Sequence, residues 1–191
     1  ISLQLKDDAC LLFDAAGRVI TFEPLVPGQS QYSPSEDLWL LRGGPEAAWA
    51  QHPRWRHAPQ ALAANPEAVL AASGDGDVLW VFGPTPLAES PSEPALSQRW
   101  RLIAQLDRFG RSQRYHHADG SGEQQDTPRG HLIALTDGVG RHYRLRHARI
   151  HAGRPAQGLL QADDGWRLVA VELVSDPVGI GTFPLTLVRY G

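Results

Sequence analysis

The stretch that decides the fold is Leu102-Ile103-Ala104-Gln105-Leu106-Asp107-Arg108-Phe109-Gly110-Arg111. It returns as Leu132-Ile133-Ala134-Leu135-Thr136-Asp137-Gly138-Val139-Gly140-Arg141. A shorter version, 12–19, lies near the start of the chain, and a degenerate one, 162–169, lies near the end. Such internal similarity is typical of one structural unit stacked side by side. The repeats therefore point to architecture before they point to chemistry.

Each copy has an apolar run, a reversal built on an Asp and a Gly, and an alternating run. The turn residues are Asp14 with Gly17, Asp107 with Gly110, Asp137 with Gly140, and Asp163 with Gly165. Asp can accept a hydrogen bond from the backbone two residues on, and Gly supplies a positive φ without a Cβ clash. After the third turn Tyr143 and Leu145 alternate with polar residues, which is the period of a half-buried strand. We therefore predict a mainly β fold of antiparallel hairpins, stacked in an open sheet.

Composition is ordinary for a folded protein, with 191 residues of which 42% are hydrophobic. That length can bury the core of one domain or of two small ones. No apolar run is long enough for a transmembrane helix, and the first residues lack the pattern of a signal peptide. The lone Cys10 excludes an internal disulfide and a Cys-based zinc site, and one thiol fits a reducing cytoplasm. The chain contains no Met, so we interpret it as a piece of a longer protein.

Charge is segregated along the chain. Residues 1–98 carry 5 basic and 12 acidic residues, 99–154 carry 11 and 5, and 155–191 carry 2 and 4. The change of sign follows a Pro/Ser-rich connection, 83–97. We therefore divide the chain into an acidic β segment with Pro-rich loops, 1–97, and a region of repeat hairpins, 98–191, which together can also form one continuous domain. The two charges predict mutual contact or a partner for the basic part.

The first half contains fewer clear signals. Residues 1–25 predict a strand, a turn and a strand, and 45–66 predict either an irregular covering loop or a short helix. Asn65-Pro66-Glu67 has the pattern of a helix start, with Asn as cap and Pro in the first position. The alternative is a hairpin that turns at 73–76 before the apolar strand 78–82, and the hairpin is favoured.

Eight histidines raise the question of a metal site. His147 and His151 can share one strand face, whereas His116 and His117 are adjacent and point to opposite faces. No carboxylate or Cys completes a recognisable ligand spacing, so surface and packing roles are favoured and no metal is predicted. The stretch 75–77 resembles the start of a calcium loop but lacks the bidentate Glu, which favours a plain turn.

No catalytic motif stands out from the sequence, so we predict neither an enzyme nor a cofactor. One alternative function is a basic nucleic-acid binder. Its candidate stripe consists of Arg111, Arg114, Arg141, Arg144, Arg146 and Arg149, with Tyr115 and Tyr143. Tyr143 falls on the strand face opposite Arg144, so cations and aromatics do not share a stacking platform. A solvated or internally paired Arg face is therefore favoured, and nucleic acid is not the expected partner.

Several stretches resemble the Rhs (rearrangement hot spot) or YD-repeat family. Residues 13–19 resemble its Tyr-Asp-x-x-Gly-Arg-Leu unit, 32–39 resemble the lead-in of Rhs proteins of bacterial type VI secretion, and 185–191 resemble the strand before a further repeat. Three of the four copies depart from the pattern, with Leu106, Thr136 and Ala162 in place of the Tyr. The stretch 176–181 also resembles the self-cleavage site at the end of an Rhs core, but a β-turn is favoured there.

The resemblance implies a structural segment of a YD-repeat β-shell that encapsulates a toxin domain for secretion. Its partners are then the remainder of the same polypeptide and the toxin domain, with self-association through strand edges and no membrane. It implies residence in the bacterial cytoplasm before export within a larger effector. The other alternative is a stand-alone β-sheet module that binds carbohydrate or protein.

Overall fold

The structure is a computed structural model, and it describes residues 1–44, 47–55, 58, 60–84, 98–118, 127, 130–149, 166–177 and 184–190. The described residues form a mainly antiparallel β fold, which confirms the predicted fold class. The chain divides into two compact units, 1–114 and 115–191, and the division falls within strand β9. No helix of the described residues is long and apolar enough to cross a membrane.

Unit 1 begins with a three-stranded meander. Its strands are β1 (Ser2–Leu5), β2 (Cys10–Phe13) and β3 (Val19–Phe22), paired antiparallel in that order. The sequence predicted two strands here, and the structure adds a third. The additional hairpin closes because the backbone N–H of Lys6 donates to the carbonyl of Ala9 across 2.9 Å.

A second set of strands forms the main sheet of unit 1. These strands are β4 (Ser30–Ser33), β5 (Leu38–Arg42), β6 (Val69–Ser73), β7 (Val78–Pro84) and β8 (Gln98–Asp107). They lie in the order β8-β7-β6-β5-β4, and each neighbouring pair is antiparallel. The hairpin of β6 and β7 is the one that the sequence favoured over a helix at this position.

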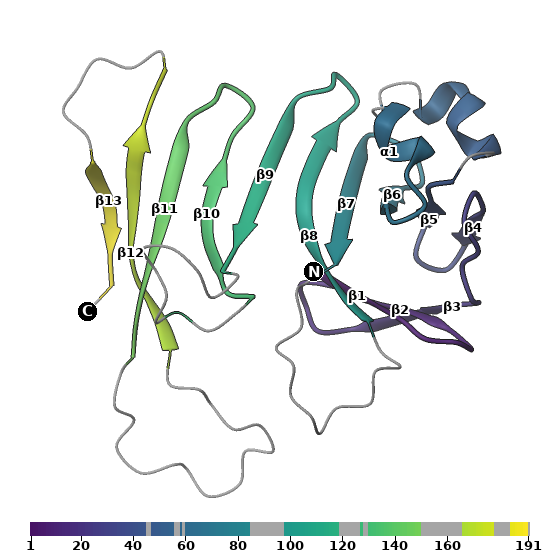
Figure 1. The fold of residues 1–191 in the computed structure, drawn as a ribbon, viewed down its shortest axis with the longest axis horizontal. Helices are drawn as coiled ribbons and strands as arrows, with labels where there is room; N and C mark the ends of the chain where they lie inside the picture. Colours follow the sequence, from purple (N-terminus) through teal and green to yellow (C-terminus); the bar gives the residue numbers. More distant parts are fainter. Residues whose placement is uncertain are drawn as a thin grey trace, which may run out of the picture. The chain divides into compact units, whose positions relative to one another are not determined.

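Strand β8 pairs with three other strands, because it is long enough for one of its edges to pair with two strands in succession. One edge pairs with β7, and the other pairs with β1 over 98–101 and with β9 (Ser112–His117) over 104–106. Trp100 lies where β1 and β7 flank β8, and it is fully buried. The fork lets the β1–β3 meander leave the plane of the main sheet (Figure 1).

Both faces of the main sheet in unit 1 are covered. Along β6, Val69 and Ala71 belong to one core, and Leu70 and Ala72 belong to the other. The first core is completed by β1, β2 and β3, and the second by the segment between β5 and β6. Because both faces of β6 are buried, its sequence is a continuous apolar run without polar alternation. Each fully buried Leu or Val contributes about 1.5–3 kcal/mol of hydrophobic stabilisation.

The segment between β5 and β6 contains short helices. It contains the 3-10 helices η1 (Ala48–Gln51) and η2 (Pro53–Trp55) and the helix α1 (Gln60–Ala64), which lie together beside β5 and β6 (Figure 1). Trp49 and Trp55 are buried in the second core, and the indole N–H of Trp49 donates to the carbonyl of Arg42 across 2.8 Å. Of the two alternatives for this stretch, the structure therefore has the short helix.

Unit 2 contains the end of β9 and the strands β10 (Leu132–Thr136), β11 (His142–Arg149), β12 (Trp166–Ser175) and β13 (Leu185–Arg189). They follow one another as antiparallel neighbours (Figure 1). Among the side chains of β10 to β13, only those of Ala134 and Ala170 are buried. These strands are therefore far less covered than the main sheet of unit 1.

The sheet of unit 2 is amphipathic. Directly paired residues on one face are apolar, and they form the row Leu135, Tyr143, Leu173 and Leu185 and the row Leu145, Val171 and Val188. The opposite face carries Arg144 paired with Glu172, and Arg146 paired with Ala170. Paired residues point to the same face of a sheet, so the alternation seen in the sequence of β11 extends across its neighbours.

Candidate functional site at the hairpin turns

The repeated feature of this chain is the turn that starts with an Asp and ends with a Gly and an Arg. At Asp137, Oδ1 accepts the backbone N–H groups of Val139 and Arg141, both at 3.0 Å, and Oδ2 accepts Nε–H of Arg141 at 2.7 Å. The corresponding distances are 2.9, 3.0 and 2.6 Å at Asp107, and 2.8, 2.9 and 2.7 Å at Asp14. One carboxylate therefore ties together backbone and side chain in each described turn.

The glycines of the same turns adopt the left-handed conformation. Gly17, Gly110 and Gly140 have φ of 81°, 78° and 86°. Each donates its N–H to the carbonyl oxygen of the Asp three residues before it, at 3.2, 2.9 and 3.0 Å. An L side chain is strained at such a φ, which is the physical reason for Gly in this position.

Hydrogen bonds set the charge state of the turn carboxylates. The Arg18 side chain, followed by the backbone N–H of Arg18, lowers the pKa of Asp14. Burial acts to raise the pKa of Asp107 and Asp137, but the side-chain and backbone hydrogen bonds from the Arg of each turn outweigh it, and both pKa values are lowered. The lowered pKa values favour the ionised carboxylate, which is the form that accepts all of these hydrogen bonds.

Sequence reasoning missed the role of the Arg. It listed Arg111 and Arg141 in a candidate basic stripe and favoured a solvated or internally paired face without naming their partners, which the structure identifies as Asp107 and Asp137 at 2.6 and 2.7 Å. The signal was present in the sequence, because an Arg follows the Gly in each of the three described turns. A recurring cation four residues after a recurring Asp indicates an internal pair, since the reversal brings the two side chains together.

Other members of the predicted stripe are also engaged. Arg146 lies 3.8 Å from the carboxylate of Glu172, and the hydroxyl of Tyr143 donates to Oδ2 of Asp137 across 3.3 Å. Arg149 lies at the end of β11. Arg111 and Arg141 lie in turns and Arg146 lies near Glu172, which agrees with the solvated or internally paired Arg face that the sequence favoured.

Four of the described histidines form two pairs on or directly beside the strands of unit 2. His116 Nε2 and His142 Nδ1 each lie 3.2 Å from the hydroxyl of Thr136, and the rings of His131 and His147 lie 5.6 Å apart. Within the part of the chain that the structure describes, no group of three or more metal-ligating side chains forms.

Some predicted positions lie outside the described residues. The fourth turn, Asp163 with Gly165, is among them, as are His151 and the stretch 178–181 of the cleavage-like sequence. Pro177 is described, and its Cγ faces Gly140 across the space that a Cβ on Gly140 would enter.

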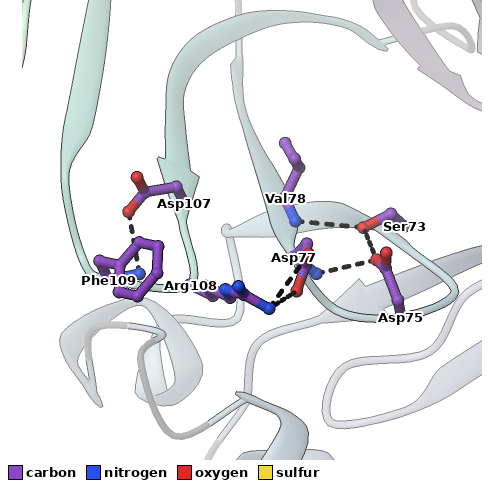
Figure 2. A network of polar contacts seen from close by, with 7 residues as sticks. All are labelled: Ser73, Asp75, Asp77, Val78, Asp107, Arg108 and Phe109. Atoms are coloured by element: carbon purple, nitrogen blue, oxygen red, sulfur yellow. Dashed lines mark hydrogen bonds and ion pairs between the residues drawn. The ribbon is translucent and has the colours of Figure 1, made fainter.

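Two turns of unit 1 lie side by side and are joined by polar contacts (Figure 2). The backbone N–H of Arg108 donates to the carbonyl of Asp77 across 3.0 Å, and its guanidinium lies 3.3 Å from the Asp77 carboxylate. Asp75 Oδ1 accepts the hydroxyl of Ser73 at 2.6 Å and the N–H of Asp77 at 2.9 Å. The Ser73 bond is the main cause of the lowered pKa of Asp75. The calcium-like stretch is therefore engaged in a turn.

A shallow pocket of about 280 Å³ lies between η1 and α1. Its walls are small or neutral side chains: Gly44, Ala47, Ala48, Ala50, Gln51, Gln60, Ala63 and Ala64. Among the described residues, this lining offers neither a nucleophile nor a titratable group for acid–base chemistry.

Comparison with known proteins places the chain beside a bacterial toxin. The chain is 35% identical over 175 residues, 91% of its length, to "Toxin protein Tse5" of Pseudomonas aeruginosa (strain PAO1). It spans only 11% of the length of that relative. No family model matches the chain. The chain is thus related to one limited stretch of a much longer toxin protein.

Proposed function

We propose that this chain is a structural segment of an Rhs-type, YD-repeat shell that encloses a toxin domain for secretion. The observation that carries the proposal is the sheet of unit 2, in which, among the described residues, β13 pairs with β12 alone and no side chain of the two apolar rows is buried. Leu185 and Leu187 on β13 are 52% and 47% exposed. A sheet with exposed apolar side chains and an unpaired edge needs neighbours, as one strip of a larger wall would have.

The repeated turns support the same function. The same Asp, Gly and Arg contacts close the β2–β3, β8–β9 and β10–β11 hairpins, so one local turn motif recurs along the chain. Repeated units of this kind gain stability mainly from contacts with their neighbours. The relation to a limited stretch of a long toxin protein also fits a part that acts within a larger polypeptide.

The proposal includes the absence of catalysis in this segment. The partners are then the remainder of the parent polypeptide and its toxin domain. The protein would reside in the bacterial cytoplasm before export as part of that effector. The nucleic-acid alternative is less favoured because Tyr143 and Arg144 lie on opposite faces of β11, so aromatic rings and cations do not share a stacking platform.

The test compares the isolated chain with a version extended by the next segment of its parent open reading frame. Hydrogen exchange of the β13 amides is measured in both, with the buried amides of β6 as the internal control. We expect the extension to slow exchange in β13 and to leave β6 unchanged. Equal exchange of β13 in both proteins, or a toxin domain in the parent protein that is as sensitive to protease as the free domain, would overturn the proposal.

A further inference from the structure

We propose that the tip of the β8–β9 hairpin, formed by Arg108, Phe109 and Arg111, is a docking point for a protein partner. The partner surface that fits is an apolar pocket edged by carboxylates. This inference goes beyond the proposed structural function, because it concerns a contact with a separate protein.

The first argument is the exposure of Phe109. Its side chain is 70% exposed, the highest value among the large exposed hydrophobic residues of the described chain. The ring lies next to two cations, with the guanidinium carbons of Arg108 and Arg111 at 5.0 and 5.4 Å from its centroid. These distances are within the range of cation–π contacts, so the ring and the two cations form one compact surface feature.

The second argument comes from the sister turns. The same hydrogen bonds close the turn at Asp14, which carries Ala15 and Ala16, and the turn at Asp137, which carries Gly138 and Val139. The turn geometry therefore requires neither an Arg nor a Phe at its two central positions. Arg108 is accounted for in part by its link to Asp77, whereas Phe109 is an addition to a turn that folds without it, which indicates a use outside the turn.

The third argument is rigidity. The backbone N–H of Phe109 donates to Oδ1 of Asp107 across 2.9 Å, and the Arg108 side chain contacts Asp77 of the neighbouring turn (Figure 2). The backbone N–H of Arg108 also donates to the carbonyl of Asp77. The backbone of the tip is thus fixed to two turns of the same unit. A fixed backbone has less conformational freedom to lose on binding, and aromatic residues and Arg are enriched in protein interfaces.

The chemistry of the tip selects the partner class. Arg111 uses Nε for Asp107, and Arg108 uses Nη1 for Asp77, so each guanidinium keeps further N–H donors for a carboxylate. Their side chains are 71% and 59% exposed. A protein fits better than a nucleic acid, because the tip holds a single aromatic ring and unit 1, to which the tip belongs, carries 13 acids against 10 cations.

The experiment uses a phage-displayed library of short random peptides, panned on the full chain. Binders to the double variant Arg108→Gly, Phe109→Val, which carries the two central residues of the turn at Asp137, are removed first. We expect the enriched peptides to combine a bulky apolar residue with Asp or Glu. No enrichment, or enriched peptides without this combination, would overturn the proposal.

The affinity of the best peptide is then measured for single variants. Phe109→Val should weaken binding by about tenfold or more, equivalent to about 1.4 kcal/mol. The matched control Val139→Ala changes the same position of a sister turn and should leave binding unchanged. Thermal unfolding checks that each variant is folded. If Phe109→Val binds the peptide as tightly as the wild type, the assignment is wrong. It is also wrong if the chain binds oligo-thymidine and Phe109→Val abolishes that binding, because the partner would then be a nucleic acid.

Discussion

Nε of Arg141 lies 2.7 Å from Oδ2 of Asp137, and the same pair, at almost the same distance, recurs in the two other described turns. The Arg141 pair is the least exposed of the three, with side chains 42% and 12% exposed, against 65% and 21% for Arg18 and Asp14. Solvent screens an ion pair more strongly as it becomes more exposed. The same local motif therefore has different energetic weight in the two units.

Removal of the Arg charge should show this difference. Arg141→Gln should lower the midpoint of thermal unfolding more than Arg18→Gln, because the Asp137 carboxylate is left with fewer donors in a less exposed site, and the second ion pair of Arg18, with Glu36 at 3.2 Å, is itself solvent-exposed. Both variants are compared with the wild type by differential scanning calorimetry in low salt. An equal or larger effect of Arg18→Gln would contradict the ranking by exposure.

Substitution of the turn glycines separates backbone strain from crowding. Gly110→Ala should cost about 1 kcal/mol of unfolding free energy, because φ is positive and nothing lies within 4 Å of the new Cβ. Gly140→Ala should cost more, since its Cβ would also lie 3.2 Å from Cγ of Pro177.

Urea unfolding measures both glycine variants. The double variant Gly140→Ala, Pro177→Ala is the control, because it keeps the strained φ and removes the crowding. It should recover part of the loss seen with Gly140→Ala. A neutral effect of Gly110→Ala would show that the positive φ is not required at this turn.

The turn carboxylates predict a loss of stability in acid. The folded-state pKa values of Asp14, Asp107 and Asp137 are lowered from an ordinary value of 3.8. Their contribution is therefore fully present above that pH and is lost as the pH falls through the lowered folded-state values. The midpoint of thermal unfolding, followed from neutral to acid pH, should fall in this window. A variant with all three Asp→Asn changes should have a flatter profile there, and an equally steep profile would argue against these groups.

Cys10 should be unreactive in the folded protein. It is fully buried on β2, and burial raises the pKa of its thiol to about 12 despite the opposing charge of Arg42. At mildly alkaline pH a thiol reagent such as Ellman's reagent should give no rapid reaction until the protein unfolds, because the thiolate is the reactive form. One thiol should then be titrated in denaturant. Fast reaction of the native chain would show that the core around β2 opens readily.

The exposed edge at β13 predicts self-association of the isolated chain. Leu185, Leu187 and Val188 are 52%, 47% and 43% exposed on a strand that pairs with β12. Leu187→Lys places a charge there, which disfavours pairing between strand edges. Sedimentation velocity over a range of concentrations should show association of the wild type and a shift toward monomer in the variant. A strict monomer at high concentration would favour the stand-alone binding module.

The local rules of the hairpins could be read from the sequence. The spacing of Asp and Gly predicts the reversals, and the alternation of Tyr143 and Leu145 with Arg144 and Arg146 predicts the two faces of β11, because both depend on residues a few positions apart. The antiparallel β class follows from the same signals. The pairing of Arg111 with Asp107 and of Arg141 with Asp137 was not predicted, since a cation beside a turn is equally consistent with a basic surface.

Only the tertiary structure decided which strands lie beside one another and what covers them. The fork at Trp100, between β1 and β7, joins residues from three distant parts of the chain, and no local pattern specifies it. The link from Arg108 to Asp77 likewise depends on two turns meeting in space. The sequence of this protein determines its turns and strand faces because they arise from short-range sterics and periodicity. The pairing order and the two cores of unit 1 depend on long-range burial, which the folded chain alone reveals.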